Sequence, residues 1–288
     1  MKNHPSPIDD AKKLEKEANT KLNSFQLFFR KEKNLTAANM FKRAASLYKI
    51  NNKYKDFIRC MITASTIFEN NDELHEASIC YLDIARAYRL IYDENGIEFY
   101  LKHLNSPHNH KNNYGEIFKE IGEFYKELGN YDHSITYFAN AINEFELQNR
   151  FYSINVCLDN MCRIYLNSNK FKEAGDTLLK MSSKIKIAND NLIFTAILSF
   201  IIYDPIYAKK VLDEKHTMLR NNDVKFLNTC INCIINKDSQ QFHNAINEFR
   251  FKFKIKDEHM NIIKHLKKCL DDQIANHTND NNDDIDLT

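Results

Sequence analysis

The sequence predicts an all-α protein built as a solenoid of stacked antiparallel helix hairpins. The 288 residues include only 5 Gly and 4 Pro, too few for the tight turns that a β-rich fold of this length needs. Hydrophobic residues make up 43% and charged residues 27%, which is the composition of a globular chain. An apolar pattern with helical spacing also recurs every 20 residues, which predicts helices of about 16 residues joined by short turns.

The first helix is predicted from about Ile8 to Phe29, and it ends in a cluster of aromatic rings. Three cations follow directly: Arg30, Lys31 and Lys33. Rings beside cations at a helix end suit a membrane interface, where lysines meet anionic lipid. The alternative is that Leu22, Phe25 and Phe29 pack on the next helix, which would leave Phe28 as the most exposed ring.

The repeated pattern then defines the core face of each following helix by spacings of i, i+4 and i+7. Its first five copies are Ala37, Phe41, Ala44; Phe57, Met61, Ala64; Ala77, Tyr81, Ile84; Ile97, Leu101, Leu104; and Ile117, Ile121, Phe124. The register slips once and restarts at Ser134, Phe138, Ala141; Ile154, Leu158, Met161; Ala174, Leu178, Met181; and Phe194, Leu198, Ile201. Because no helix hairpin buries its apolar face alone, stacked hairpins are expected.

One window, from Ile121 to Ala141, resembles the tetratricopeptide repeat. Gly122 would let the two helices of a hairpin approach closely, and Gly129 suits the left-handed turn between them. Small residues at Ser134 and Ala141 would accept large neighbours. The resemblance implies a tetratricopeptide-like solenoid whose helices are longer than those of the ordinary 34-residue repeat.

About fourteen helices are expected in all, arranged as a solenoid over residues 1–204 and a helical bundle over residues 205–275. Three apolar groups mark the bundle: Phe226, Cys230 and Cys233; Ala245 and Phe249; and Ile262, Leu266 and Cys269. The last helix is predicted from about Asp257 to Ile274. Residues 276–288 are acidic and rich in Asn, which is typical of a flexible, solvated tail.

No motif in the sequence predicts a catalytic, cofactor or metal site. The sequence lacks the phosphate-binding, dinucleotide-binding, zinc-protease and serine-hydrolase signatures, so an enzyme is not expected. His103, His108 and His110 are assigned to a solvated loop, because no carboxylate or thiol accompanies them. Cys230 and Cys233 fit one face of a core helix better than a zinc or redox site, because no second pair follows.

Charge divides the chain unevenly. The first 270 residues hold 40 Lys and Arg against 33 Asp and Glu, whereas residues 271–288 hold six Asp and no Lys or Arg. This basic excess suggests an acidic protein surface as partner but is too small to predict nucleic-acid binding. Lys264, Lys267 and Lys268 form either a solvated face or an electrostatic contact. No signal peptide is recognised and the apolar run Leu192–Tyr203 is too short to span a bilayer, so a cytoplasmic location is expected.

Several features together resemble the soluble NSF attachment proteins (SNAPs), of the alpha or gamma type. They are the 20-residue step, the chain length, the helix that contains His265–Lys268, and an acidic end with a penultimate leucine. A further feature is a run of residues that follows the Phe-Phe pair: Ala37, Phe41, Lys42, Arg43, Ala44, Ala45, Tyr48 and Lys49. The resemblance implies a twisted sheet of antiparallel helix hairpins with a C-terminal helical bundle. It also implies a cytoplasmic, peripherally membrane-associated adaptor without cofactors. Its partners would be a syntaxin-like SNARE four-helix bundle and the AAA ATPase NSF, which separates the bundle in vesicle fusion and intracellular transport.

The same resemblance assigns roles to a few residues. Leu287 would stimulate NSF together with the adjacent Asp286, and Lys267 and Lys268 would contact NSF. Phe28 and Phe29 would touch the membrane.

Some positions depart from the alpha type. The segment Arg30–Lys33 is short and charged, as in the gamma type, and Glu116 and Val156 stand where alpha-SNAP has lysines. The alternative function is a generic helical-repeat scaffold that binds peptide tails of other proteins.

Overall fold

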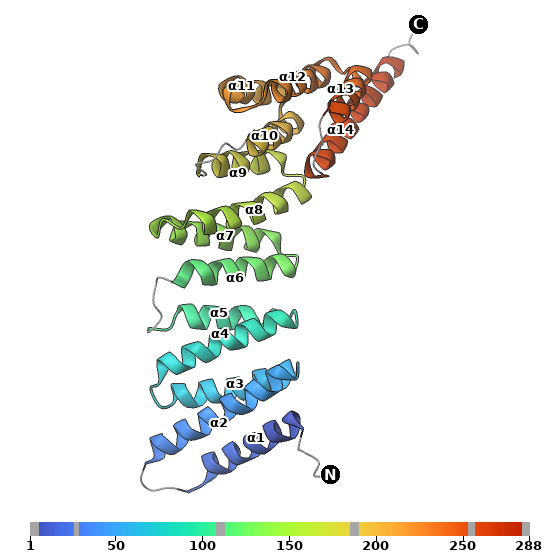
Figure 1. Ribbon diagram of the computed structural model, residues 1–288. Helices are drawn as coiled ribbons and strands as arrows, with labels where there is room; N and C mark the ends of the chain where they lie inside the picture. The colour runs from blue at the N-terminus through green and yellow to red at the C-terminus, as the bar shows by residue number, and fades with distance from the viewer. Residues whose placement is uncertain (1–5, 26–28, 108–112, 185–189, 253–256, 284–288) are drawn as a thin grey trace. The chain divides into compact units, whose positions relative to one another are not determined.

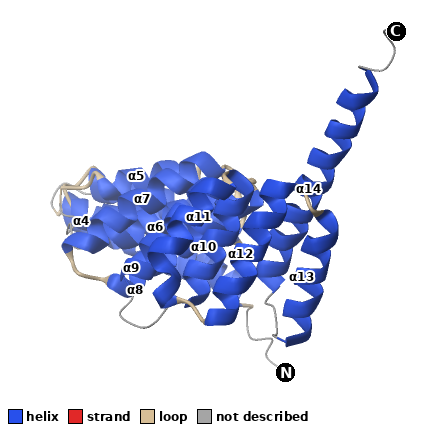
Figure 2. Ribbon diagram, turned by 90° about the horizontal axis from the view of Figure 1, so that it is seen from above, coloured by secondary structure: helices blue, strands red, loops and turns tan. Residues whose placement is uncertain are grey.

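The computed structural model describes residues 6–25, 29–107, 113–184, 190–252 and 257–283 (Figure 1). Across these ranges the backbone is helical and contains no strand (Figure 2). The fold is therefore all-α, as predicted. In chain order the described helices are α1 (Pro7–Asn23), α2 (Arg30–Ile50), α3 (Tyr54–Glu69), α4 (Leu74–Leu90), α5 (Gly96–Leu104), α6 (Tyr114–Glu127), α7 (Tyr131–Leu147), α8 (Phe151–Asn167), α9 (Phe171–Lys184), α10 (Asp190–Tyr203), α11 (Pro205–Lys215), the 3-10 helix η2 (His216–Met218), α12 (Asn221–Asn236), α13 (Ser239–Lys252) and α14 (Asp257–Asp283).

The chain divides into two compact units, residues 1–144 and 145–288. In unit 1, helices α1 to α6 form successive layers in which each helix packs on the next (Figure 1). In unit 2, α8, α9 and α10 stack in the same way, and α10 also contacts α12 and α14. The domain boundaries expected after residues 204 and 275 stay predictions.

One turn geometry recurs between the helices and explains the 20-residue step. Helices α2, α3, α4, α6, α7 and α8 are each followed within three residues by a residue with positive φ. These residues are Asn52, Asp72, Tyr92, Gly129, Asn149 and Asn169. The amide of the following residue then donates to the carbonyl five positions back, which belongs to an aromatic residue at Tyr48, Phe68, Tyr88, Tyr125, Phe145 and Tyr165. This is the Schellman arrangement, which satisfies carbonyls that the helix end leaves unpaired.

The predicted core positions are buried at nearly every copy of the repeat, including Phe41, Met61 and Ile84. Leu101 is the clear exception, because it remains 38% exposed while Tyr100 is fully buried. The helix that carries both, α5, has only nine residues. Its core face therefore follows Ile97, Tyr100 and Leu104, spaced i, i+3 and i+7, rather than the i+4 position of the longer helices.

The tetratricopeptide-like window has the geometry expected of it. A Cβ placed on Gly122 would meet the ring of Phe138 at 3.0 Å, so the two helices approach as closely as a glycine permits. The Ser134 hydroxyl, fully buried, donates to the Gly122 carbonyl at 2.7 Å. Gly129 adopts φ +77°, the left-handed conformation that glycine reaches without steric cost.

Both end helices differ in length from the prediction. α1 ends at Asn23 instead of near Phe29, because Ser24 adopts an extended backbone and its hydroxyl donates to the Lys21 carbonyl. α14 continues to Asp283 instead of ending near Ile274. The early end of α1 leaves Phe25 outside the helix.

Candidate functional site

The loop between α1 and α2 holds two aromatic rings that make little contact with the protein. Phe25 keeps 88% of its surface exposed and Phe29 keeps 75%. Leu22, by contrast, packs against the core of unit 1. The packing alternative is therefore wrong for both rings, and Phe25 joins Phe29 as a candidate contact. Phe28 lies outside the described residues.

A buried lysine holds this loop in place. Lys33, in the first turns of α2, is 9% exposed, and its ammonium group donates to the carbonyls of Leu22 at 3.0 Å and Ser24 at 2.6 Å. These carbonyls end α1 and have no partner within that helix. A cation at a helix C-terminus is also favoured by the helix dipole. Lys33 therefore ties the end of α1 to the start of α2. This contact fixes the distance between the two ends of the segment that carries Phe25 and Phe29, which we call the aromatic loop.

The backbone at Phe29 adopts an unfavourable conformation for a residue with a side chain. Its φ is +60°, and no side chain caps the helix α2 that begins at the next residue. A left-handed conformation costs a non-glycine residue roughly 1–2 kcal/mol. The exposed ring gains no packing energy that would offset this cost. Residues that break local rules in this way are concentrated at functional sites.

The three cations next to the loop have different environments. Arg30 is exposed and makes no ion pair within the described ranges. Lys31 is paired with Glu73 at 2.9 Å. Lys33 is buried at the end of α1, so the expectation that it meets lipid headgroups is wrong. The candidate site thus consists of Phe25, Phe29 and the guanidinium of Arg30.

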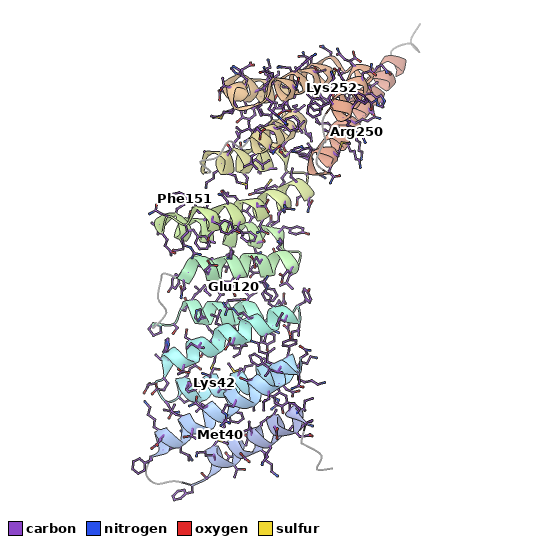
Figure 3. The ribbon with its side chains drawn as sticks, viewed as in Figure 1. Met40, Lys42, Glu120, Phe151, Arg250 and Lys252 are labelled. Carbon is purple, nitrogen blue, oxygen red and sulfur yellow. The ribbon has the colours of Figure 1, made fainter. Side chains whose placement is uncertain are left out.

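Charge is distributed unequally within unit 1. Residues 1–68 hold 14 Lys and Arg against 6 Asp and Glu, whereas residues 69–144 hold 6 against 14. Many of the latter carboxylates are paired inside the unit. Glu120, labelled in Figure 3 near α6, accepts from Arg86 of α4 at 2.6 Å and from the Tyr100 hydroxyl of α5 at 3.0 Å. Arg89 likewise bridges Glu123 and Glu127. The free positive charge of unit 1 therefore lies at α1–α3.

The second candidate region is the outer face of α14 in unit 2. Lys264, Lys267 and Lys268 are exposed there, and no ion pair is formed by these three within the part of the chain that the structure describes. The opposite face of the helix is buried at Ile262, Ile263, Leu266 and Leu270. Residues 145–270 hold 20 Lys and Arg against 13 Asp and Glu, which accounts for the whole excess of the first 270 residues. Asp286 and Leu287 lie outside the described residues.

The histidine and cysteine residues that could be considered as metal ligands are buried wherever the structure describes them. His103 is 8% exposed in α5, where its Nδ1 lies 2.9 Å from the Ser78 hydroxyl and burial lowers its pKa, so its assignment to a solvated loop is wrong. His108 and His110 lie outside the described residues. Cys230 and Cys233 are buried in α12, and burial raises the pKa of both thiols. Within the described ranges, no three His, Cys, Asp or Glu side chains gather as metal ligands.

Comparison with known protein families identifies the family to which this chain belongs. The family model described as "Soluble NSF attachment protein, SNAP" matches residues 9–271, most of the chain. The chain belongs to the SNAP family. This is a family of adaptors rather than of enzymes. No curated protein matches the sequence individually.

Three solved structures align with this SNAP-family chain at low sequence identity and with low TM-scores. BtubC (BKLC) from P. vanneervenii aligns with a TM-score of 0.42 and 11% identity, covering 78% of this chain and 91% of its own. PilF from Pseudomonas aeruginosa aligns with a TM-score of 0.36 and 11% identity over 81% of this chain and 99% of its own. Get4 from C. therm. aligns with a TM-score of 0.34 and 10% identity, with 88% of each chain covered.

Among the described helices, none is long and apolar enough to cross a membrane.

Proposed function

We propose that this chain is an adaptor that binds syntaxin-like SNARE four-helix bundles and recruits and stimulates an NSF-like AAA ATPase, which separates them. Membership of the SNAP family over residues 9–271 is the observation that supports the proposal most strongly. The adaptor would act at the cytoplasmic surface of membranes, in vesicle fusion and intracellular transport.

The loop after α1 supports a peripheral membrane contact. Phe25 and Phe29 are exposed rings beside the exposed Arg30. Rings of this kind rest at the depth of the lipid headgroups, while the guanidinium meets anionic lipid. Phe28 belongs to the same segment of the sequence and adds a third ring to the proposed contact. Binding to the membrane and to a membrane-anchored bundle at once would raise the effective concentration of the adaptor.

Charge supports a contact with an acidic helical bundle. The basic excess lies in residues 1–68 and 145–270, and the intervening acidic residues are largely paired within their own unit. A contact spread over many weak charge pairs depends on ionic strength. The affinity for an assembled SNARE bundle should therefore fall as salt is raised.

The end of the chain is the proposed contact with the ATPase. Lys267 and Lys268 of α14 are exposed cations, and Asp286 and Leu287 follow at the acidic terminus. An apolar side chain next to carboxylates can anchor a terminus that orders on binding. Leu287→Ala should therefore leave SNARE binding unchanged and reduce stimulation of the ATPase, whereas Ile285→Ala, a matched control, should retain it. Equal stimulation by wild type and Leu287→Ala would remove Leu287 from the proposal.

The decisive experiment is ATP-dependent disassembly of a purified SNARE complex by NSF, with and without this protein. Disassembly that requires the protein supports the adaptor, and absence of any stimulation contradicts it. A pull-down from cytosol under conditions that block ATP hydrolysis tests the alternative. Recovery of a hexameric ATPase with a helical bundle supports the adaptor, whereas recovery of unrelated peptide-tail ligands supports a generic scaffold.

A further inference from the structure

Unit 2 contains a half-enclosed cavity of about 470 Å³ that the proposed adaptor contacts do not use. Helices α8, α9, α10 and α14 line it, so the fold brings together residues of the segments 159–178, 191–195 and 261–265. The volume lies within the range of 300–1,000 Å³ that is typical of ligand sites. No sequence motif marks the place, because the segments lie up to about 100 residues apart.

The cavity has an apolar floor and a rim of amide side chains. Phe171, Leu178 and Ile262 form the floor and are buried themselves. Four asparagine residues stand around it: Asn167, Asn169, Asn191 and Asn261. All four are exposed, and their side-chain amides make no hydrogen bond with any residue that the structure describes. Each of these amides therefore has a donor and an acceptor available to a ligand.

The charged groups of the cavity neutralise one another. Arg163 donates from Nε to the Asp159 carboxylate at 2.8 Å, one helical turn away on α8. The remaining titratable side chains are Cys162, which is buried, and His265, whose ring lies 4.7 Å from that of Phe171. A site for a phosphate or a carboxylate requires an excess of positive charge. The balanced pair therefore favours a ligand, or a part of one, that carries no net charge.

The walls of the cavity are fixed by a contact between two of the helices that line it, α10 and α14. His259, 5% exposed in α14, places its Nε2 2.8 Å from the Thr195 hydroxyl of α10. The His259 ring also packs against Phe194 at 5.0 Å. These contacts hold α14 against α10, so the rim residues on the two helices keep their spacing. A preformed site loses less entropy when it binds a flexible ligand.

We propose that this cavity binds an extended, uncharged peptide segment of a partner protein. One aliphatic side chain of the segment enters the floor at Leu178 and Ile262, and the amides of Asn191 and Asn261 pair with its main chain. A carboxamide both donates and accepts, as a peptide group does, so it recognises main chain independently of sequence. Main-chain hydrogen bonds then supply affinity, and the apolar floor supplies specificity.

Phage-displayed heptapeptides selected on the full-length protein test the proposal. The expected result is enrichment of sequences without net charge that carry one central aliphatic residue. The most enriched peptide, labelled with a fluorophore, is then titrated by fluorescence polarisation. Asn191→Ala and Asn261→Ala should each weaken its binding about five- to tenfold, the effect of one lost hydrogen bond. The matched control is Asn232→Ala with Asn236→Ala, two exposed amides of α12, which should bind as the wild type does.

Three outcomes would overturn the proposal. They are the absence of enrichment, enrichment of strongly charged peptides, and equal affinity for the wild type and the rim variants. A synthetic peptide of residues 276–288, added as competitor, tests the chain's own terminus. Displacement of the labelled peptide by it would identify that terminus as the occupant and would equally overturn a partner segment.

Discussion

Helices α1 and α10 have similar lengths but are held by different forces. α10 buries nine consecutive residues, Ile193–Ile201, and so packs on all sides. α1 has 17 residues, and only Ala11 and Ala18 of them are fully buried. Ile8, Leu14 and Leu22 are partly buried against the same core, and the rest of its attachment is polar. The comparison shows that the centre of unit 2 depends on apolar area, whereas the helix that leads into the aromatic loop has a small apolar contact and depends on charge and hydrogen bonding as well.

Glu15 is the centre of the polar attachment of α1. Its carboxylate accepts from the Tyr48 hydroxyl of α2 at 3.0 Å and from the guanidinium of Arg59 on α3. Arg59 also donates to Asp56 at 3.0 Å. The hydrogen bond from Arg59, and to a smaller extent that from Tyr48, holds the pKa of Glu15 below its usual range in spite of partial burial. Burial and the Glu15 carboxylate together raise the pKa of Tyr48 to about 12, so its hydroxyl remains a donor.

The largest effect is expected in α10. Phe200 is fully buried and its ring meets that of Tyr207 edge to face, with centroids 5.0 Å apart. Phe200→Ala would leave a cavity and should lower the free energy of unfolding by about 3–5 kcal/mol. Urea denaturation followed by circular dichroism measures the change. Tyr203→Ala removes a half-exposed ring from the same helix and serves as the control. Similar losses in the two variants would show that burial does not dominate in α10.

A smaller effect is expected at Lys33. Lys33→Met keeps much of the aliphatic chain but leaves the carbonyls of Leu22 and Ser24 without their donor. The free energy of unfolding should fall by about 1–2 kcal/mol, and hydrogen exchange of the amides at residues 22–25 should accelerate. Binding to vesicles that contain anionic lipid should fall as well, because the aromatic loop is no longer held. Lys33→Arg should restore binding in part, and full binding by Lys33→Met would show that the loop needs no positioning.

The Glu15 network should contribute less, because Arg59 is half exposed and solvent screens the pair. Glu15→Gln should destabilise the attachment of α1 by about 1 kcal/mol, measured as faster hydrogen exchange in α1 than in α2–α4. Glu17→Gln, an exposed carboxylate of the same helix, is the matched control. If exchange in α1 is unchanged by Glu15→Gln, apolar contacts alone hold the helix.

The same carboxylate predicts a dependence on pH. Because the pKa of Glu15 is lower in the folded protein than in the unfolded chain, its contribution is complete above the unfolded value of about 4.3. It is lost as the pH falls through the folded value. Protection of α1 amides should therefore decline below about pH 4.3 in the wild type. In Glu15→Gln the protection should be lower at neutral pH and change less over this range, and parallel profiles would contradict the assignment.

The helical stacking could be predicted from the sequence because its signals are local. Aromatic residues and left-handed turn residues recur at a 20-residue step, and each turn is closed by bonds within five residues. The order of apolar positions then fixes the buried face of each helix. The prediction at Leu101 was wrong because α5 presents Tyr100 to the core instead, and the repeat does not distinguish between these neighbouring positions.

The candidate sites were less predictable because they depend on contacts between helices. A lysine beside aromatic residues predicts a headgroup contact, whereas Lys33 is used within the fold because α1 ends six residues earlier than expected. His103 is placed in a loop by its neighbours in the sequence, whereas the structure buries it against Ser78, which lies 25 residues away and which no local pattern indicates. The cavity of unit 2 joins three segments whose spacing carries no motif.

The smallest effect separates backbone strain from the exposed ring at Phe29. Phe29→Ala and Phe29→Gly both remove the ring, so both should weaken binding to anionic vesicles equally. They differ in the backbone, because alanine keeps the cost of φ +60° and glycine does not. Phe29→Gly should therefore be the more stable of the two variants. Because glycine also loses more conformational entropy on folding, which offsets part of this gain, the difference should be only about 0.5–1 kcal/mol. Equal stability would mean that the left-handed turn at Phe29 carries no strain. Equal binding by wild type and both variants would mean that the aromatic ring serves no membrane contact.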